Sequence, residues 1–231
     1  MRWLPSFFLS TALSLGALPA VSCEVALVLA VDVSGSVDDR EFETQMRGLA
    51  EALRDGAISE ALVLKQASVL VMQWTGNQRQ RVSIPWRHVK NFDDTDQLAD
   101  DIENTPRIWR NFSTAIGEAL IFAQAAFDEV PQCKRKLIDV SGDGKSNEGI
   151  APRAVHAQLR AAGITVNGLA IEQSDKTLTE YYQDNLIVGP GSFAIRADNF
   201  QDYPDRIRLK LLREITKQLS AVPPLQESGN L

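Results

Sequence analysis

Hydrophobic residues along the chain fall into short, nearly unbroken runs separated by segments of mixed character. The run at 25–31 contains no polar residue and ends at Asp32. Similar, largely apolar runs occupy 67–74 and 164–171. Runs of this length without polar alternation are typical of strands buried on both faces, as in a parallel sheet.

Helical spacing is found between these runs. Asp38 and Glu41 form a D-x-x-E capping pattern at the start of one such segment. The apolar residues that follow recur every three or four positions: Phe42, Met46, Leu49 and Leu53. Further helices are expected at 93–104, 114–129, 152–162, 176–185 and 204–220.

Shorter strands complete the alternation. A turn at 75–77 joins the run at 67–74 to a strand at 81–86 as a hairpin, and further strands are expected at 137–140 and 192–197. This order of elements predicts an α/β fold with a doubly wound, mostly parallel central sheet. One antiparallel edge strand and helices on both faces complete the expected architecture.

The first 22 residues have the layout of a secretory signal peptide. Arg2 is their only charge, a stretch rich in Leu, Phe and Ala follows it, and Pro19 breaks that stretch. Ala20 and Ser22 place small residues at positions −3 and −1 of a cleavage site before Cys23. An uncleaved membrane anchor is the alternative interpretation, because the stretch before Cys23 is uncharged.

These features divide the chain into a signal peptide at 1–22, one domain at 23–220 and a flexible C-terminal tail at 221–231. No second apolar span of about 18 residues follows the signal segment, so no transmembrane span is expected in the mature chain. We therefore expect an exported protein that is periplasmic or secreted.

Charge and composition narrow the classes of function. The 231 residues include 24 basic and 30 acidic side chains, for a net charge of −6, and no basic stripe stands out. Nucleic-acid binding through phosphate neutralisation is therefore not expected. Two cysteines exclude a four-thiolate zinc site, and two histidines leave little room for histidine-based chemistry.

Oxygen-bearing side chains gather in three loops where such sheets place their functional residues, at the carboxyl ends of strands. Asp32, Ser34 and Ser36 follow the most apolar strand, Thr114 opens a helix, and Asp143 follows a later strand. Carboxylates and hydroxyls without thiol or imidazole suit Mg²⁺ or Mn²⁺ rather than zinc. Taken singly, the loops have simpler interpretations, since Asp32 and Ser34 can cap a helix and Asp143 can belong to a turn.

The three loops also carry a resemblance to a known family. DVSGS at 32–36 resembles the D-x-S-x-S signature of the von Willebrand factor A-like domain, the fold of integrin inserted domains. The segment opened by Thr114 resembles the threonine loop of that fold, and Asp143 resembles the aspartate of its T-D-G loop, with Gly142 where threonine is common. The resemblance covers about 24–220. More narrowly, VLAVDVSGSVD and IDVSGDG resemble an uncharacterised family of secreted bacterial proteins built on this domain.

The resemblance implies a metal-ion-dependent adhesion site. Ser34, Ser36 and Thr114 would bind the metal directly, and Asp32 and Asp143 directly or through water. Mg²⁺ is the expected ion, with Mn²⁺ or Ca²⁺ as alternatives. The expected partner is a protein ligand that presents an Asp or Glu carboxylate to the metal.

The sequence matches no complete catalytic motif among those considered, so we expect that the chain is not an enzyme. The segment Gly144-Lys145-Ser146 resembles the end of a phosphate-binding loop, but Asp139 stands where that motif requires glycine. Asp139 lies inside an apolar strand and is therefore expected to have a fixed partner. A metal-assisted hydrolase is one alternative, although it lacks a nearby histidine or a clear general base. A structural component of an envelope assembly is another.

The same resemblance implies a disulfide between Cys23 and Cys133. Cys23 lies nine residues before Asp32, and Cys133 lies ten before Asp143. In this fold the two strands that carry those aspartates are parallel neighbours, so both cysteines are expected at the same edge of the sheet. An oxidising compartment would preserve the bridge. The competing interpretation is a lipoprotein in which Cys23 is acylated and anchors the chain.

Overall fold

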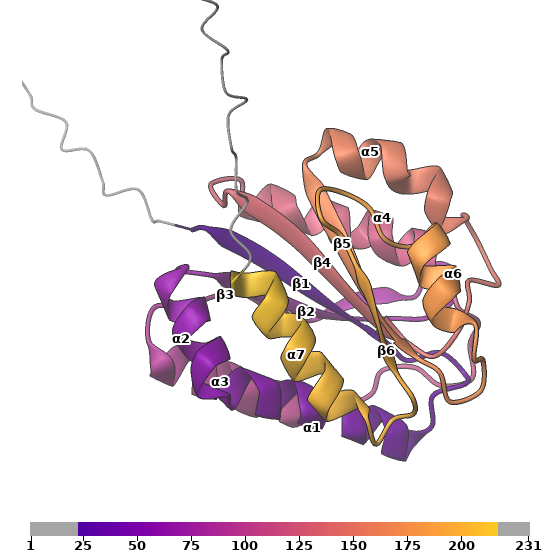
Figure 1. Cartoon of the computed structure of the whole chain (residues 1–231), viewed down its shortest axis with the longest axis horizontal. Coiled ribbons are helices and arrows are strands. Elements are labelled where there is room, and N and C mark those ends of the chain that lie inside the picture. The colour runs from indigo at the N-terminus through magenta and orange to yellow at the C-terminus, as the bar shows by residue number, and fades with distance from the viewer. Residues whose placement is uncertain (1–22, 217–231) are drawn as a thin grey trace, which may run out of the picture.

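Helices cover both faces of a six-stranded sheet in the computed structural model, which describes residues 23–216 (Figure 1). The strands are β1 (Val25–Asp32), β2 (Ser68–Trp74), β3 (Gln80–His88), β4 (Arg135–Gly142), β5 (Ile164–Ile171) and β6 (Ala194–Ala197). Their order across the sheet is β3-β2-β1-β4-β5-β6. β3 runs antiparallel to β2, and the other neighbouring pairs are parallel, as predicted. The expected signal peptide at 1–22 and tail at 221–231 lie outside the described residues.

The helices form two layers. One face of the sheet carries α1 (Asp39–Arg54), α2 (Gly56–Leu64), α3 (Phe92–Glu103) and α7 (Tyr203–Thr216), and the other carries α4 (Ile116–Ala126), α5 (His156–Ala161) and α6 (Leu178–Asn185) (Figure 1). Short 3-10 turns adjoin two of them, at Phe127–Glu129 after α4 and at Pro152–Val155 before α5. Among residues 23–216, no helix has the length and apolarity needed to cross a bilayer.

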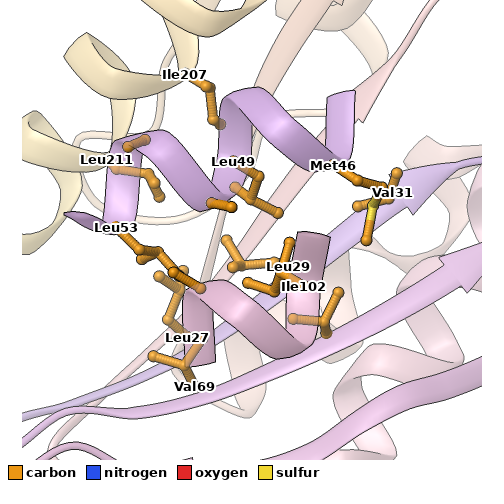
Figure 2. Packing of buried hydrophobic residues seen from close by; sticks show 14 of the residues in the cluster. Leu27, Leu29, Val31, Met46, Leu49, Leu53, Val69, Ile102, Ile207 and Leu211 are labelled. Carbon is orange, nitrogen blue, oxygen red and sulfur yellow. The ribbon is translucent and has the colours of Figure 1, made fainter. Parts of the chain in front are cut away.

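The apolar strand β1 explains why the sheet has two cores. Its side chains alternate between the faces, so that one set packs with α1, α3 and α7 and the other with α4 and α6. Figure 2 shows the first set, in which Val31 lies beside Met46 of α1 and Leu29 lies near Leu49 of the same helix. Leu27 lies beside Val69 of β2. All eight residues of β1 are buried, which is why the run lacks polar alternation.

Most expected elements are found, and the exceptions have local causes. Asp38 caps α1 in a capping box with Glu41, as predicted. Helix α2 was not predicted, because its nearly all-apolar sequence lacks helical periodicity; Asp55 caps its first turn. The expected helix at 152–162 begins instead as a 3-10 turn at Pro152. The helix expected from Thr114 begins at Ile116, which leaves Thr114 in the preceding loop.

A disulfide joins Cys23 to Cys133 at the amino-terminal ends of β1 and β4. Both cysteines are buried, and their Cα atoms lie 4.6 Å apart. Backbone hydrogen bonds continue the pairing beside it, with Lys134 N–H donating to the Cys23 carbonyl at 3.0 Å. The bridge closes a loop of 110 residues between two neighbouring strands.

A buried ionic cluster fixes α7 to the sheet. The ammonium of Lys210 on α7 lies 2.5 Å from an Asp139 carboxylate oxygen on β4 and 2.7 Å from one of Glu214. Asn167 on β5 donates to the same Glu214 oxygen at 2.8 Å. Burial, with repulsion from Asp139, raises the pKa of Glu214 to about 8. Asp139 thus has the fixed partner that its place in an apolar strand required.

Replacing the buried lysine tests this cluster. Lys210→Met leaves Asp139 buried without its cation, so we expect the free energy of unfolding to fall by about 3–5 kcal/mol. Urea denaturation at pH 7 measures the loss. The matched control Lys90→Met removes an exposed ammonium and should change stability by less than about 0.5 kcal/mol. Equal effects of the two substitutions would show that the cluster does not hold α7.

Candidate metal centre

The site lies at the carboxyl ends of β1 and β4, the edge of the sheet opposite the disulfide. Asp32 is the last residue of β1 and is completely buried. Its Oδ1 accepts the Ser34 backbone N–H at 2.7 Å, which turns the chain sharply after the strand. The Val33 N–H donates to the Trp74 carbonyl at the end of β2, so the turn begins at a fixed point of the sheet.

Hydroxyl groups connect this turn to the end of β4. The hydroxyls of Ser34 and Ser36 lie 3.2 Å apart, and that of Ser36 donates to Asp143 Oδ1 at 2.6 Å. Asp143 directly follows β4 and is buried. Ser36 is exposed, whereas Ser34 is buried, so the group of oxygens extends from the interior to the surface.

Thr114 belongs to the same cluster, although it lies outside the helix. Its Oγ1 is 3.3 Å from the point where a β-carbon on Gly144 would stand, and the Ser36 hydroxyl is 3.9 Å from that point. The Thr114 N–H donates to the side-chain oxygen of Asn147 at 2.9 Å, and its carbonyl accepts the Asn147 N–H at 2.9 Å. This reciprocal pairing with the loop after β4 explains why the helix starts later.

The electrostatics of the cluster favour a bound cation. Asp32 Oδ2 is buried and has no hydrogen-bond partner among the described residues. Burial, with repulsion from Asp143, raises the pKa of Asp32 to about 7. Burial also raises the pKa of Asp143, and the Ser36 hydroxyl only partly offsets this. Two carboxylates removed from water, one with an unpaired oxygen, fit a bound cation.

Gly142 lies close to two buried oxygens. A β-carbon at this position would lie 2.7 Å from Asp32 Oδ2 and 2.8 Å from the hydroxyl of Tyr182, so a side chain does not fit there. The Tyr182 hydroxyl is buried and has no partner among the described residues. Glycine at this position therefore leaves room for the Asp32 carboxylate and the Tyr182 hydroxyl.

Arg107 braces the turn from outside the cluster. Its guanidinium donates to the carbonyls of Val33, Ser34 and Val37 at 3.3, 3.1 and 2.6 Å, and to Asp39 at 3.0 Å. The side chain is 5% exposed. The Gly35 N–H adds a 2.7 Å bond to the Phe112 carbonyl, so the loop between α3 and α4 lies directly on this turn.

The structure brings together all five residues that the sequence selected as metal ligands: Asp32, Ser34, Ser36, Thr114 and Asp143. It adds Arg107, Asn147 and Tyr182 as neighbours that position or enclose them. None of these three lies in a recognisable motif, and only long-range contacts reveal their place.

Residues 22–219 match the family described as "Protein of unknown function (DUF1194)". The chain belongs to this family. A comparison with curated proteins gives no match.

Solved structures identify the fold of this DUF1194 protein as that of a von Willebrand factor A domain. Proximal thread matrix protein 1 from the mussel byssus, with a zinc-occupied adhesion site, is 21% identical with a TM-score of 0.63 over 83% of this chain and 48% of its own. A von Willebrand factor type A protein from Catenulispora acidiphila is 18% identical, with a TM-score of 0.59 over 85% of this chain and 44% of its own. The pilus adhesin SpaC from Lactobacillus rhamnosus GG is 14% identical, with a TM-score of 0.57 over 84% of this chain and 31% of its own. The chain thus spans half or less of the length of these proteins.

The donor set of the DUF1194 protein fits a hard divalent cation. Residues 23–216 contain no group of three or more Asp, Glu, His or Cys side chains placed to hold a metal. A metal at this site would therefore depend on the hydroxyls of Ser34, Ser36 and Thr114 as well as on the two carboxylates. Oxygen donors of this kind suit Mg²⁺, Mn²⁺ or Ca²⁺.

Removing the buried charge should stabilise the metal-free protein. The pKa of Asp32 is raised from 3.8 to about 7, so the folded state holds a proton that the unfolded chain loses in this range. The free energy of unfolding in EDTA should therefore fall as pH rises from about 4 to about 7. Asp32→Asn should be more stable than the parent by about 2–4 kcal/mol at pH 8, with little difference at pH 4.

Urea denaturation in EDTA at both pH values measures this difference. The control Asp96→Asn changes an exposed aspartate on α3 and should follow the parent at each pH. An Asp32→Asn variant that is less stable than the parent at pH 8 would contradict the assignment of a strained, cation-requiring carboxylate.

Proposed function

We propose that this chain is an exported, metal-dependent protein-binding module of the adhesion type. Asp32, Ser34, Ser36, Thr114 and Asp143 would hold Mg²⁺ at the end of the sheet, and the metal would bind an Asp or Glu carboxylate of a protein partner. The observation that carries the proposal is the buried, unpaired oxygen of Asp32 beside the second buried carboxylate. Without a cation this arrangement is costly, because both charges are removed from water.

The hydroxyl donors explain why the site suits an outside ligand. Asp32 and Asp143 together offset the charge of a divalent ion, while Ser34, Ser36 and Thr114 are neutral donors. When bound, the metal supplies an electrophilic point for an oxygen from outside the chain. The exposed position of Ser36 places the open side of the cluster at the surface, where a partner carboxylate can reach it.

The surroundings favour binding over hydrolysis. A hydrolase needs a base placed to activate water. Glu41 is near enough to raise the pKa of Asp143, but its two oxygens accept hydrogen bonds from Asp38 N–H and Gln173. His156 bonds to the Asn185 carbonyl at the end of α6. The von Willebrand factor A fold, shared with a matrix protein and a pilus adhesin, supports the same interpretation.

The two cysteines support a location outside the cytoplasm. The Cys23–Cys133 disulfide suits an oxidising environment outside the cytoplasm. A sulfur in this bond has no thiol left for acylation, so the disulfide favours a freely exported chain over one anchored through Cys23. Cleavage of the signal peptide at 1–22 would place Cys23 at the start of the mature protein.

Isothermal titration calorimetry tests the metal site. We expect one Mg²⁺ per chain at pH 8, with Mn²⁺ competing for the same site. Asp143→Asn should weaken binding by at least about tenfold, because it removes one charged donor. The matched control Asp96→Asn should bind as the parent does. Undiminished binding by Asp143→Asn would contradict the site.

The partner class is tested separately. Proteins retained by the immobilised chain from its own exported fraction should be released by EDTA and absent with Asp143→Asn. A Glu→Gln or Asp→Asn change at the contacting carboxylate of a retained protein should abolish retention, whereas added salt should not. Retention that survives EDTA would contradict metal-mediated binding, and turnover of a phosphate or ester substrate lost in Asp32→Asn would favour the hydrolase.

A further inference from the structure

A groove is lined by residues of the edge strand β6, of α7 and of the segments next to β6. β6 is the last strand in the sheet, so within residues 23–216 its outer edge pairs with no other strand. The groove has a volume of about 410 Å³ and is lined by residues on and around these two elements. It contains none of the five proposed metal ligands.

The backbone of β6 offers hydrogen-bonding groups to this side. The Phe193 and Ala197 carbonyls accept N–H groups of Gly168 and Glu172 on the β5 side. Because successive residues of a parallel strand direct their backbone groups to alternate sides, those of Ala194 and Arg196 are directed to the outer edge. An edge with unpaired N–H and C=O groups is a template for a further strand.

The floor of the groove is apolar. Phe193 is almost buried, Ile195 is half-buried, and Leu209 of α7 is 48% exposed. An exposed leucine next to a free strand edge is a surface that an extended partner could cover with alternate apolar side chains. The apolar floor and the strand edge therefore favour the same kind of ligand.

Basic side chains surround this floor. Arg196, Arg206 and Arg213 line the groove, with Asp198 as the acidic member. Arg196 is already paired with Glu172 and Asp198, at 3.0 and 2.6 Å. Arg206 is already paired with Asp202 at 3.0 Å. The Arg213 guanidinium lies 3.7 Å from the centre of the Phe193 ring, and none of the ion pairs formed within residues 23–216 includes it. Within residues 23–216, Arg213 is therefore the arginine of the groove that is left to pair with an acidic group of a ligand.

We propose that the outer edge of β6 and this groove bind an extended acidic segment of a partner protein, which adds a strand to the sheet. Main-chain hydrogen bonds to Ala194 and Arg196 would hold the segment. Its apolar side chains would cover Leu209, and a carboxylate of the segment would pair with Arg213. No metal takes part, so this surface is distinct from the proposed metal centre.

Fluorescence anisotropy with a labelled short peptide of alternating glutamate and valine tests the surface, using the whole protein in EDTA. We expect saturable binding that Arg213→Glu weakens by roughly tenfold. Arg208→Glu is the matched control, because it lies on the same helix outside the groove and should bind as the parent does. A peptide with lysine in place of glutamate should not bind.

Backbone pairing is tested without changing the protein. The same peptide with N-methyl groups on alternate backbone nitrogens keeps its charge but loses donors on one edge, so methylation of one of the two registers should abolish binding. Equal binding of both methylated peptides, or equal effects of Arg213→Glu and Arg208→Glu, would overturn the proposal. A dimer in sedimentation analysis that Arg213→Glu dissociates would also overturn it, since a second copy would then occupy the edge.

Discussion

The structure depends on one constraint: two carboxylates, those of Asp32 and Asp143, are buried close together at one end of the sheet. Asp32 ends β1 and Asp143 directly follows β4, so the parallel pairing of these two strands brings the carboxylates together. Burial raises the pKa of both groups, and one oxygen of Asp32 has no partner among the described residues. Burial therefore disfavours the charged form of both groups, and a bound cation or a proton would offset this.

The rest of the domain is arranged to hold this end of the sheet rigid. Arg107 fixes the turn after β1 through three carbonyls, and Asn147 fixes the Thr114 loop. At the far end the disulfide joins the same two strands, and in the interior Lys210 fixes α7 to β4. β4 thus contributes Asp139 to the structural cluster and the residue after its end to the candidate metal centre. Preformed geometry of this kind reduces the ordering cost of binding.

The fold, and the place of the five candidate ligands at one edge of the sheet, could be predicted from local sequence patterns. The unbroken apolar run at 25–31 indicates a strand buried on both faces. Side chains with oxygen donors directly after strands indicate a candidate site at the edge of the sheet. Arg107 and Tyr182 could not be predicted, because their roles depend on contacts with residues far away in the chain. Hydrophobic periodicity also does not predict helix α2, whose start depends on the cap formed by Asp55. Nor does it predict the late start of α4, which depends on hydrogen bonds between Thr114 and the loop after β4.

The central claim is that the two buried carboxylates and the three hydroxyls form one metal site. Anomalous diffraction from a crystal soaked in Mn²⁺ tests it most directly, because it locates the ion independently of any model of its ligands. The account predicts a single strong peak at the carboxyl ends of β1 and β4, in contact with Ser34 and Ser36 and within direct or water-mediated reach of Asp32, Thr114 and Asp143. A strong peak elsewhere on the domain, with none at this edge of the sheet, would contradict it.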